Sequence, residues 1–216
     1  MAKSTFKKIK LIVDKAEPSK LFSSLIDDET ELKKEARLRA SHFDFKTVHK
    51  ADVGEELTSG WEIQRRLKKT IKLKHKKTHD KWLEDRFWSL IIKMGYKIVN
   101  SRHFKISFKR QSGTVGKKQI DVYAEDDETV FVVECKSKET FGRRSLQKDL
   151  EETRALQDYI RNSIFKRFDD LGKPKPKIVW IYATYNILWS SNDIERAVDG
   201  EIKILTENEI QYLETF

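Results

Sequence analysis

A glutamate and a lysine two residues apart, Glu134 and Lys136, close a strongly apolar run in the segment VFVVECKS. If this run is a strand, alternate side chains face the same way, so these two charges project together while Cys135 points to the opposite face. Asp121 lies in the preceding β-rich segment, QIDVYA, and the acidic residues 126–128 between the two segments predict a tight hairpin. The hairpin would place an aspartate, a glutamate and a lysine side by side.

Three such groups are suited to metal-assisted hydrolysis of a phosphodiester. Mg²⁺ prefers oxygen ligands and is commonly held by one or two carboxylates, several waters and a substrate phosphate. We expect Asp121 and Glu134 to supply the carboxylates, with Mn²⁺ able to substitute. A metal-bound water ionises more readily and can attack phosphorus. The ammonium of Lys136 would stabilise the negative charge that grows in the transition state.

Simpler interpretations exist for the same residues. A Glu-x-Lys pair at the end of a strand is often an ordinary charged pair at a sheet edge. The fully apolar residues 130–133 favour a functional role, because charges beside a buried segment require each other, solvent or a metal. Cys135, flanked in this way, is interpreted as a core residue rather than a nucleophile.

Glu84 is a fourth candidate, carried by a helix. The segment KWLEDRFWSLIIKMG has apolar residues at intervals of three and four, with Asp80 as its expected N-cap and Gly95 as its end. Glu84 near the start of this helix could reach the same ion as Asp121. It could equally be a solvent-facing helix charge, and Asp85 is the competing carboxylate.

The remaining pattern predicts α/β layering around a mixed sheet. KIVWIYAT is apolar on both faces, which is typical of an interior strand in a covered sheet. Thr206 and Glu209 form a capping-box pattern at the start of the last expected helix. The other expected elements are strands within 96–108 and over 201–205, and helices over 145–168 and 193–198.

The first 60 residues differ from the rest, and we predict an N-terminal α+β extension over 1–60 followed by a domain over 61–216. The extension contains a possible strand over 6–13 and a densely charged helix over 29–39. Directly after the expected boundary, residues 61–79 carry eight Lys or Arg against one Glu. This segment is interpreted either as an edge strand that lysines protect from pairing or as a phosphate-contacting arm.

The composition sets limits on the class of protein. Hydrophobic residues make up 38% and aromatic residues 11% of the 216 positions, which favours a packed, soluble protein. One cysteine excludes an internal disulfide framework and a cysteine-rich zinc site. No apolar run approaches a membrane span and no secretory signal is recognisable, so we expect a cytoplasmic protein without a membrane partner. The net charge of +9 favours polyanionic partners.

The segments WLEDRFWSLIIKMGY, QIDVYA and VFVVECKS together resemble the PD-(D/E)XK, or restriction-endonuclease-like, nucleases, and the helix is similar to that of Mrr-like members. The resemblance covers residues 80–184, about half the chain. It implies a central mixed β-sheet flanked by helices, with a metal held by Asp121 and Glu134, cleavage assisted by Lys136, and a helix carboxylate, Glu84, joining them. Ile120 stands where this family usually has proline.

A second resemblance involves TYNILWSSNDIERA, which with the nuclease-like segments is similar to the N-terminal region of bacterial and archaeal proteins that continue into a DGQHR domain and are linked to phage defence. The DGQHR motif does not occur here, so the chain would be a fragment or a stand-alone relative. Several side chains are expected phosphate contacts: Arg143, Arg144 and Gln147 after the Glu-x-Lys strand, and Lys117 and Lys118 before Asp121.

Three functions follow from these patterns. The leading hypothesis is a Mg²⁺-dependent endonuclease that cleaves DNA, with defence against foreign DNA as its expected setting. A second is a nucleic-acid-binding module with the same fold that does not cleave. A third is an interaction domain that contacts an acidic protein. Composition leaves RNA open as an alternative to DNA, and a homodimer is open because enzymes that cut duplexes often act as dimers.

Overall fold

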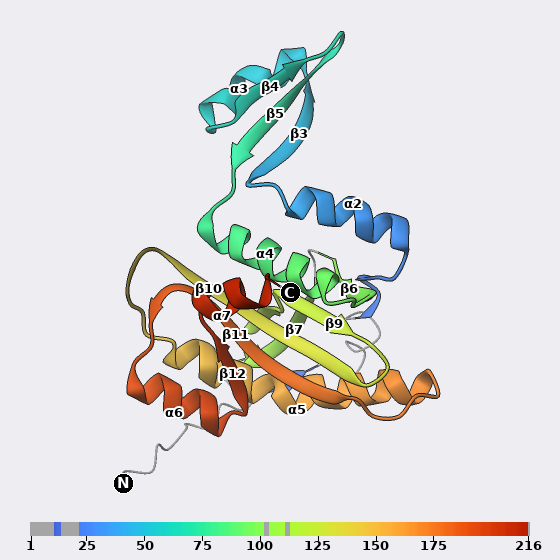
Figure 1. Ribbon diagram of the computed structural model, residues 1–216, viewed down its shortest axis with the longest axis vertical. Helices are drawn as coiled ribbons and strands as arrows, with labels where there is room; N and C mark the ends of the chain where they lie inside the picture. Colours follow the sequence, from blue (N-terminus) through green and yellow to red (C-terminus); the bar gives the residue numbers. More distant parts are fainter. Residues whose placement is uncertain (1–10, 14–21, 102–103, 111–112, 216) are drawn as a thin grey trace.

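The computed structural model describes residues 11–13, 22–101, 104–110 and 113–215, which form an α/β core with a projecting arm (Figure 1). The core is built on a mixed six-stranded sheet in the order β12-β11-β10-β9-β6-β2, flanked by helices. Its strands are β2 (Leu25–Ile26), β6 (Ile98–Asn100), β9 (Val122–Glu125), β10 (Thr129–Arg143), β11 (Lys177–Leu188) and β12 (Ile202–Leu205). The predicted fold class, a central mixed sheet between helices, is confirmed.

The predicted hairpin is formed by β9 and β10, which pair antiparallel with Val122 opposite Val133. Its turn is held by Asp126, whose Oδ1 accepts hydrogen bonds from the backbone N–H groups of Glu128 and Thr129 at 2.9 and 2.7 Å. A short polar side chain that bonds the backbone two residues on stabilises such turns. The strand β11, predicted to be interior, lies between β10 and β12 and is parallel to both.

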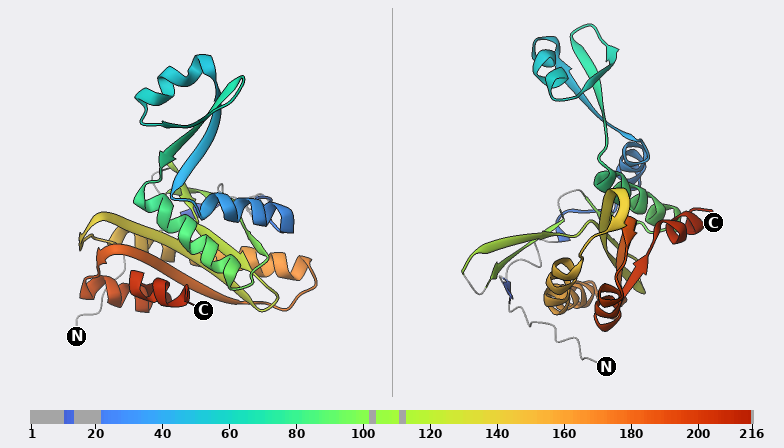
Figure 2. Two further views of the ribbon diagram at one scale, coloured as in Figure 1. Left: turned by 45° about the horizontal axis from the view of Figure 1, so that its top comes forward. Right: turned by 90° about the vertical axis from the view of Figure 1, so that its left-hand side faces the viewer.

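Helices cover both faces of this sheet (Figure 2). One face packs against the long helix α5 (Gln147–Asp170), which connects β10 to β11, and the other packs against α4 (His79–Lys93). Alternate residues of β10 therefore enter different cores, with Val132 in the α5 layer and Val133 in the α4 layer. The predicted apolar stripes are buried: Leu83, Phe87, Leu90 and Ile91 on α4, and Leu150, Leu156, Ile160 and Ile164 on α5. Met94, expected to continue the α4 stripe, is instead 49% exposed at the end of the helix.

The start of α4 differs from the prediction. Thr78 is the N-cap, since its backbone is extended and its side chain accepts a hydrogen bond from the N–H of Lys81. Asp80 instead lies in the first turn, where a negative charge interacts favourably with the helix dipole. The helices α6 (Ser191–Asp199) and α7 (Glu207–Leu213) complete the C-terminal part, and the predicted capping box of Thr206 and Glu209 is present.

The arm is a three-stranded antiparallel sheet in the order β3-β5-β4 that stands away from the core (Figure 1). It contains β3 (Phe43–His49), the 3-10 helix η1 (Lys50–Asp52), α3 (Val53–Thr58), β4 (Glu62–Arg66) and β5 (Thr70–Lys76). The expected boundary at residue 60 falls inside this hydrogen-bonded unit, between α3 and β4. The two ends of the arm lie side by side, because the N–H of Lys77 donates a hydrogen bond to the carbonyl of His42 at 3.1 Å.

Two further parts adjoin the core. The predicted charged helix is present as α2 (Glu29–Arg39), capped by Asp28. A second three-stranded sheet contains β1 (Leu11–Val13), β7 (Lys105–Arg110) and β8 (Val115–Gln119). Of the strand expected over 6–13, residues 6–10 lie outside the described part of the chain. Of the helices in the described residues, none combines the length and apolar composition needed to cross a lipid bilayer.

Candidate active site

Asp121 lies in the bend between β8 and β9, one residue before β9 begins, rather than within a strand. Its carboxylate reaches across the hairpin, and Oδ2 accepts a hydrogen bond from the backbone N–H of Cys135 at 2.8 Å. The side chain is 9% exposed. The hairpin therefore places Asp121 beside the segment that carries Glu134 and Lys136.

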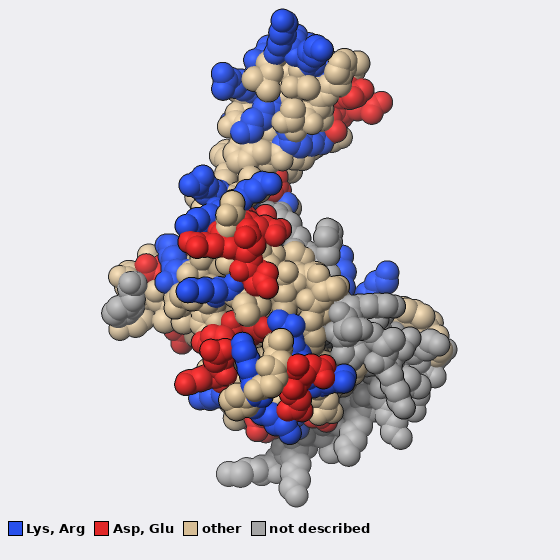
Figure 3. All heavy atoms as spheres, turned by 90° about the vertical axis from the view of Figure 1, so that its right-hand side faces the viewer, with Lys and Arg blue, Asp and Glu red and all other residues tan. Residues whose placement is uncertain are grey.

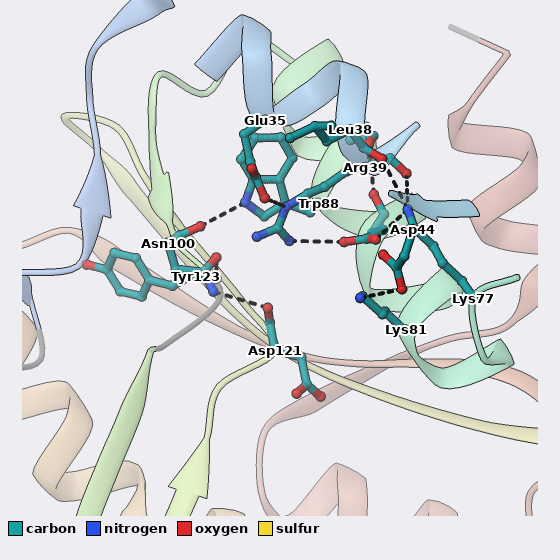
Figure 4. A network of polar contacts seen from close by, with 12 residues as sticks. Glu35, Leu38, Arg39, Asp44, Lys77, Lys81, Trp88, Asn100, Asp121 and Tyr123 are labelled. Atoms are coloured by element: carbon teal, nitrogen blue, oxygen red, sulfur yellow. Dashed lines mark hydrogen bonds and ion pairs between the residues drawn. The ribbon is translucent and has the colours of Figure 1, made fainter. Parts of the chain in front are cut away.

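The main chain around Asp121 is held from the neighbouring strand β6 (Figure 4). Asn100 donates from Nδ2 to the carbonyl of Asp121 at 3.1 Å and accepts at Oδ1 from the N–H of Tyr123 at 2.9 Å. Its own carbonyl accepts a hydrogen bond from the indole of Trp88 at 3.0 Å. A buried amide with partners on both sides fixes the local backbone, so Asn100 acts as a positioning residue for Asp121.

Glu134 and Lys136 share one face of β10, as strand alternation predicts. Oε2 of Glu134 accepts from Nζ of Lys136 at 3.3 Å and from Nζ of Lys118 at 2.9 Å. Lys136 also lies 3.9 Å from a carboxylate oxygen of Asp149 at the start of α5. Two carboxylates and two ammonium groups thus meet at the end of the hairpin, and Glu134 itself is only 4% exposed.

The pKa values reflect this concentration of charge. Burial raises the pKa of Asp121 well above its usual value, and the nearby negative charges of Glu134 and Glu84 raise it further. Burial opposes the charged form of Lys136, but the carboxylates of Glu134 and Asp121 outweigh burial and raise the pKa of this lysine. The cluster therefore holds a permanent cation next to acidic groups that repel each other.

Glu84 lies near this cluster. It is partly buried on α4, and burial together with the charge of Asp85 raises its pKa, whereas Lys136 lowers it. The charge of Glu84 in turn raises the pKa of Asp121. Its link to the cluster is electrostatic, since no hydrogen bond or ion pair between described residues joins Glu84 to Asp121, Glu134 or Lys136.

The competing carboxylate, Asp85, faces a different environment. It is 3% exposed and lies between two buried cations, with Nζ of Lys77 at 2.7 Å and Nη1 of Arg39 at 3.5 Å (Figure 4). Lys77 also donates to the carbonyls of Leu38 and Arg39 at the end of α2. Asp85 therefore joins α4 to α2 and to the base of the arm.

The donor set fits a hard divalent cation. Asp121 and Glu134 offer carboxylate oxygens, and their mutual repulsion is the kind that a bound cation relieves. Among the residues that the structure describes, no three His, Cys, Asp or Glu side chains already form a metal-binding group. Two carboxylates suffice for Mg²⁺, because water and a substrate phosphate commonly complete its shell. A cation here would compete with the ammonium of Lys118 for Glu134.

The expected phosphate contacts are only partly available. Lys118 is buried against Glu134, so its expected place on a phosphate-binding surface is wrong; as a residue of β8 it points into the core. Arg144 donates to the carbonyl of Ser137 at 2.9 Å and Gln147 donates to Glu151 at 2.9 Å. Lys117 and Arg143 are exposed, and Arg143 lies at the far end of β10.

Sequence reasoning missed two side chains of this site, Asn100 and Ser137, and gave Lys118 the wrong role. Asn100 looked like an ordinary polar residue of a short strand, and only its partners show what it does. Ser137 follows Lys136, and its hydroxyl contacts Asp80 and, at 3.2 Å, Nδ1 of His79. These contacts attach the first turn of α4 to β10 directly beside Lys136. The one signal in the sequence was a polar residue at the end of each apolar run.

Comparisons with known proteins add limited information. The chain matches no protein-family model, and no curated protein matches it in sequence. Two solved structures are similar: protein VC1899 from Vibrio cholerae (TM-score 0.42, 15% identity, 92% of this chain and 51% of that chain), and Can2 from Sulfobacillus thermosulfidooxidans in complex with cyclic tetra-adenylate (TM-score 0.40, 14% identity, 95% of this chain and 56% of that chain). This chain spans about half the length of each.

Proposed function

We propose that this protein is a metal-dependent nuclease of the PD-(D/E)XK type that hydrolyses phosphodiester bonds in DNA. The observation that carries the proposal is the convergence of Asp121, Glu134 and Lys136 at one end of a hairpin, with the Asp121 carboxylate against the N–H of Cys135 and Lys136 against Glu134. A scaffold protein gains little from burying such charges, because each one loses its hydration.

In the proposed mechanism, Asp121 and Glu134 would hold Mg²⁺, or Mn²⁺ in its place. Such an ion, when bound, would supply Lewis acidity and a water of lowered pKa near neutral pH. Lys136, which remains protonated, places its charge where negative charge develops on the scissile phosphate. Glu84 adds a carboxylate to the same cluster, and Asn100 keeps the backbone of Asp121 in place.

The partner and setting extend this proposal. The net charge of +9 favours a phosphate backbone as the partner. DNA is the proposed substrate, in the cytoplasm and in a defence role, and a homodimer would allow both strands of a duplex to be cut.

The test is cleavage of plasmid DNA with Mg²⁺ and with Mn²⁺, with and without EDTA. We expect nicking that EDTA abolishes and that Asp121→Asn, which keeps the shape of the side chain but removes its charge, lowers by about a hundred-fold or more. Asp127→Asn is the matched control, because Asp127 is an exposed carboxylate at the opposite end of the same hairpin. Equal cleavage by wild type and Asp121→Asn, or no cleavage by wild type, would refute the proposal.

One observation favours a second function. Glu134 is already engaged by the ammonium groups of Lys118 and Lys136, which could satisfy it permanently without a metal. A nucleic-acid-binding module that does not cleave would have this arrangement. Salt-sensitive DNA binding, unchanged by Mg²⁺ and without turnover, would identify this second function.

A further inference from the structure

The two faces of the arm sheet differ in character. The pairing register sets Phe45 opposite Lys74 and Thr47 opposite Lys72 on one face, and Val48 opposite Ile71 on the other. The second face is covered by α3: Ile71 and Leu73 are buried, and Lys46, which pairs with Leu73, forms an ion pair with Glu56 of α3. The arm thus uses one face to build its own small core.

The opposite face alternates aromatic rings with cations. Nζ of Lys72 lies 4.8 Å from the ring centroid of Phe45, and Nζ of Lys74 lies 4.8 Å from that of Phe43. Arg65 pairs with Lys72 across the β4–β5 register and is exposed, as is Lys76 at the end of β5. This set of six, the open face, is Phe43, Phe45, Arg65, Lys72, Lys74 and Lys76. One carboxylate lies beside them: Glu62 pairs with Nζ of Lys74 at 3.2 Å.

More positive charge surrounds the open face at the tip of the arm. Arg66, Lys68 and Lys69, in and next to the β4–β5 turn, are exposed, and no ion pair joins them to any described residue. Figure 3 shows Lys and Arg side chains gathered over the tip and along the stem of the arm. A projecting element with this charge attracts a polyanion.

The open face continues into a groove that leads to the candidate active site. Lys76 lines this groove of about 700 Å³ together with His42, Trp82, Asp80 and Tyr185. Trp82 stacks on His42 with ring centroids 6.3 Å apart and meets Tyr185 edge-on at 5.2 Å. Asp80 contacts the hydroxyl of Ser137, the residue that follows Lys136. The groove therefore carries rings and lysines, together with the carboxylates of Asp80 and Glu139, from the base of the arm to Ser137 of β10.

We propose that the open face of the arm and the Trp82 groove form a binding track for single-stranded nucleic acid that delivers the strand to the Asp121–Glu134 centre. Unpaired bases stack on aromatic rings while lysines and arginines follow the phosphates, and this combination is typical of single-strand binding. An ammonium resting on a half-buried ring, as Lys72 rests on Phe45, is weakly held, so a base can displace it and the freed lysine can turn to a phosphate. A duplex keeps its bases stacked internally and has no use for these rings.

The track deepens the proposed function, since its endpoint is the proposed cleavage centre, but binding to it is measured without metal. Fluorescence anisotropy in EDTA would compare a labelled oligothymidylate of about 15 nucleotides with a duplex of the same length. A protein that binds the single strand but does not cleave DNA would contradict the proposed nuclease and not the track. A protein that cleaves DNA but does not bind the single strand would contradict the track.

Two sets of variants separate charge from stacking. Lys72→Gln, Lys74→Gln and Lys76→Gln combined should weaken single-strand binding about ten-fold or more and reduce the slope of log affinity against log salt by about 2. The matched control removes the same charge elsewhere on the surface, by Lys166→Gln, Lys175→Gln and Lys203→Gln, and should change affinity less than about two-fold. Phe43→Leu with Phe45→Leu should weaken binding about five-fold or more without changing the salt slope.

Circular dichroism melts would show that each variant is folded. Three results would overturn the track: no single-strand binding by wild type, equal losses in the arm and control triples, or tighter binding of the duplex that is insensitive to the two phenylalanines.

Discussion

Glu84 and Asp85 are neighbouring carboxylates on α4, and their surroundings give them different roles. Glu84 is partly buried and influences Asp121, whereas Asp85 is enclosed by Lys77 and Arg39. On a helix, consecutive residues point about 100° apart, so they meet different surroundings. One carboxylate is therefore available to the proposed cleavage centre and the other holds α4 against α2.

This difference predicts opposite effects of two conservative substitutions. Glu84→Gln should lower metal-dependent cleavage by about ten- to a hundred-fold, as is typical for groups that support a metal site, with little change in thermal stability. Asp85→Asn should lower the free energy of unfolding by about 3 kcal/mol or more, because Lys77 and Arg39 would remain buried without their counter-charge. Cleavage assays and denaturant melts on both variants would measure this.

The reverse pattern would contradict the assignment. A Glu84→Gln variant that unfolds early but cleaves normally when folded would make Glu84 a structural residue. An Asp85→Asn variant of wild-type stability would mean that the buried network does not hold α4.

At the level of elements, α4 connects most parts of the core. It carries Glu84 toward the hairpin and Asp85 toward α2, and its Arg86 reaches α7 near the C-terminus. Arg86 forms a two-pronged contact with Glu214, from Nε to Oε1 at 2.8 Å and from Nη2 to Oε2 at 2.7 Å. Paired N–H···O bonds of this kind are stronger and more directional than single ones. The contact therefore anchors α7 beside the helix that bears the site.

The Arg86–Glu214 contact predicts a pH-dependent contribution to stability. The hydrogen bond from Arg86 lowers the pKa of Glu214 in the folded protein below its usual value of 4.5. Stability from a lowered carboxyl pKa is fully present above the unfolded pKa and is lost as pH falls through the folded pKa. Glu214→Gln should thus cost about 1 kcal/mol at pH 7, and the difference from wild type should disappear in acid.

Denaturant melts of both proteins across pH 3 to 7, within the range where carboxyl groups titrate, would measure the difference. Exposed Glu195→Gln on α6 is a suitable control, and it should leave the curve close to wild type. A constant difference between Glu214→Gln and wild type at every pH would show that the contact acts through packing rather than charge.

For the whole molecule, the division that matters is between the core and the arm. No described residue of 43–76 belongs to either apolar cluster of the core. The two ends of the arm meet where Lys77 bonds His42 at 3.1 Å. The arm is therefore an insertion that joins the core at its base, where Asp44 also pairs with Lys81 of α4 at 2.6 Å, and it can be removed without opening the central sheet.

Replacing residues 43–76 by a short glycine linker should leave a folded core. We expect the melting temperature to fall by no more than about 5 °C, since both main clusters stay intact, and single-strand binding to fall by about ten-fold or more. Calorimetry and anisotropy on the same preparation would test this. A deletion variant that fails to fold would show that the arm belongs to the core, and one that binds as well as wild type would remove the arm from the binding surface.

The sequence alone was sufficient for much of the local structure and for the placing of Glu134 beside Lys136. The apolar spacing of α4 and α5, the acidic turn at 126–128 and the Thr206 capping box all use neighbours in the chain, so they can be predicted without the fold. Strand alternation likewise places Glu134 and Lys136 together.

Only the tertiary structure decided which charges are partners. Lys118 turned inward to Glu134, Asp85 was enclosed by two cations, and Asn100 bridged the backbone on either side of Val122. It also showed that residues 43–76 form one sheet across the expected boundary at 60. These outcomes depend on contacts between residues far apart in the chain, and the spacing of residues along a sequence does not specify which distant element will face a given side chain.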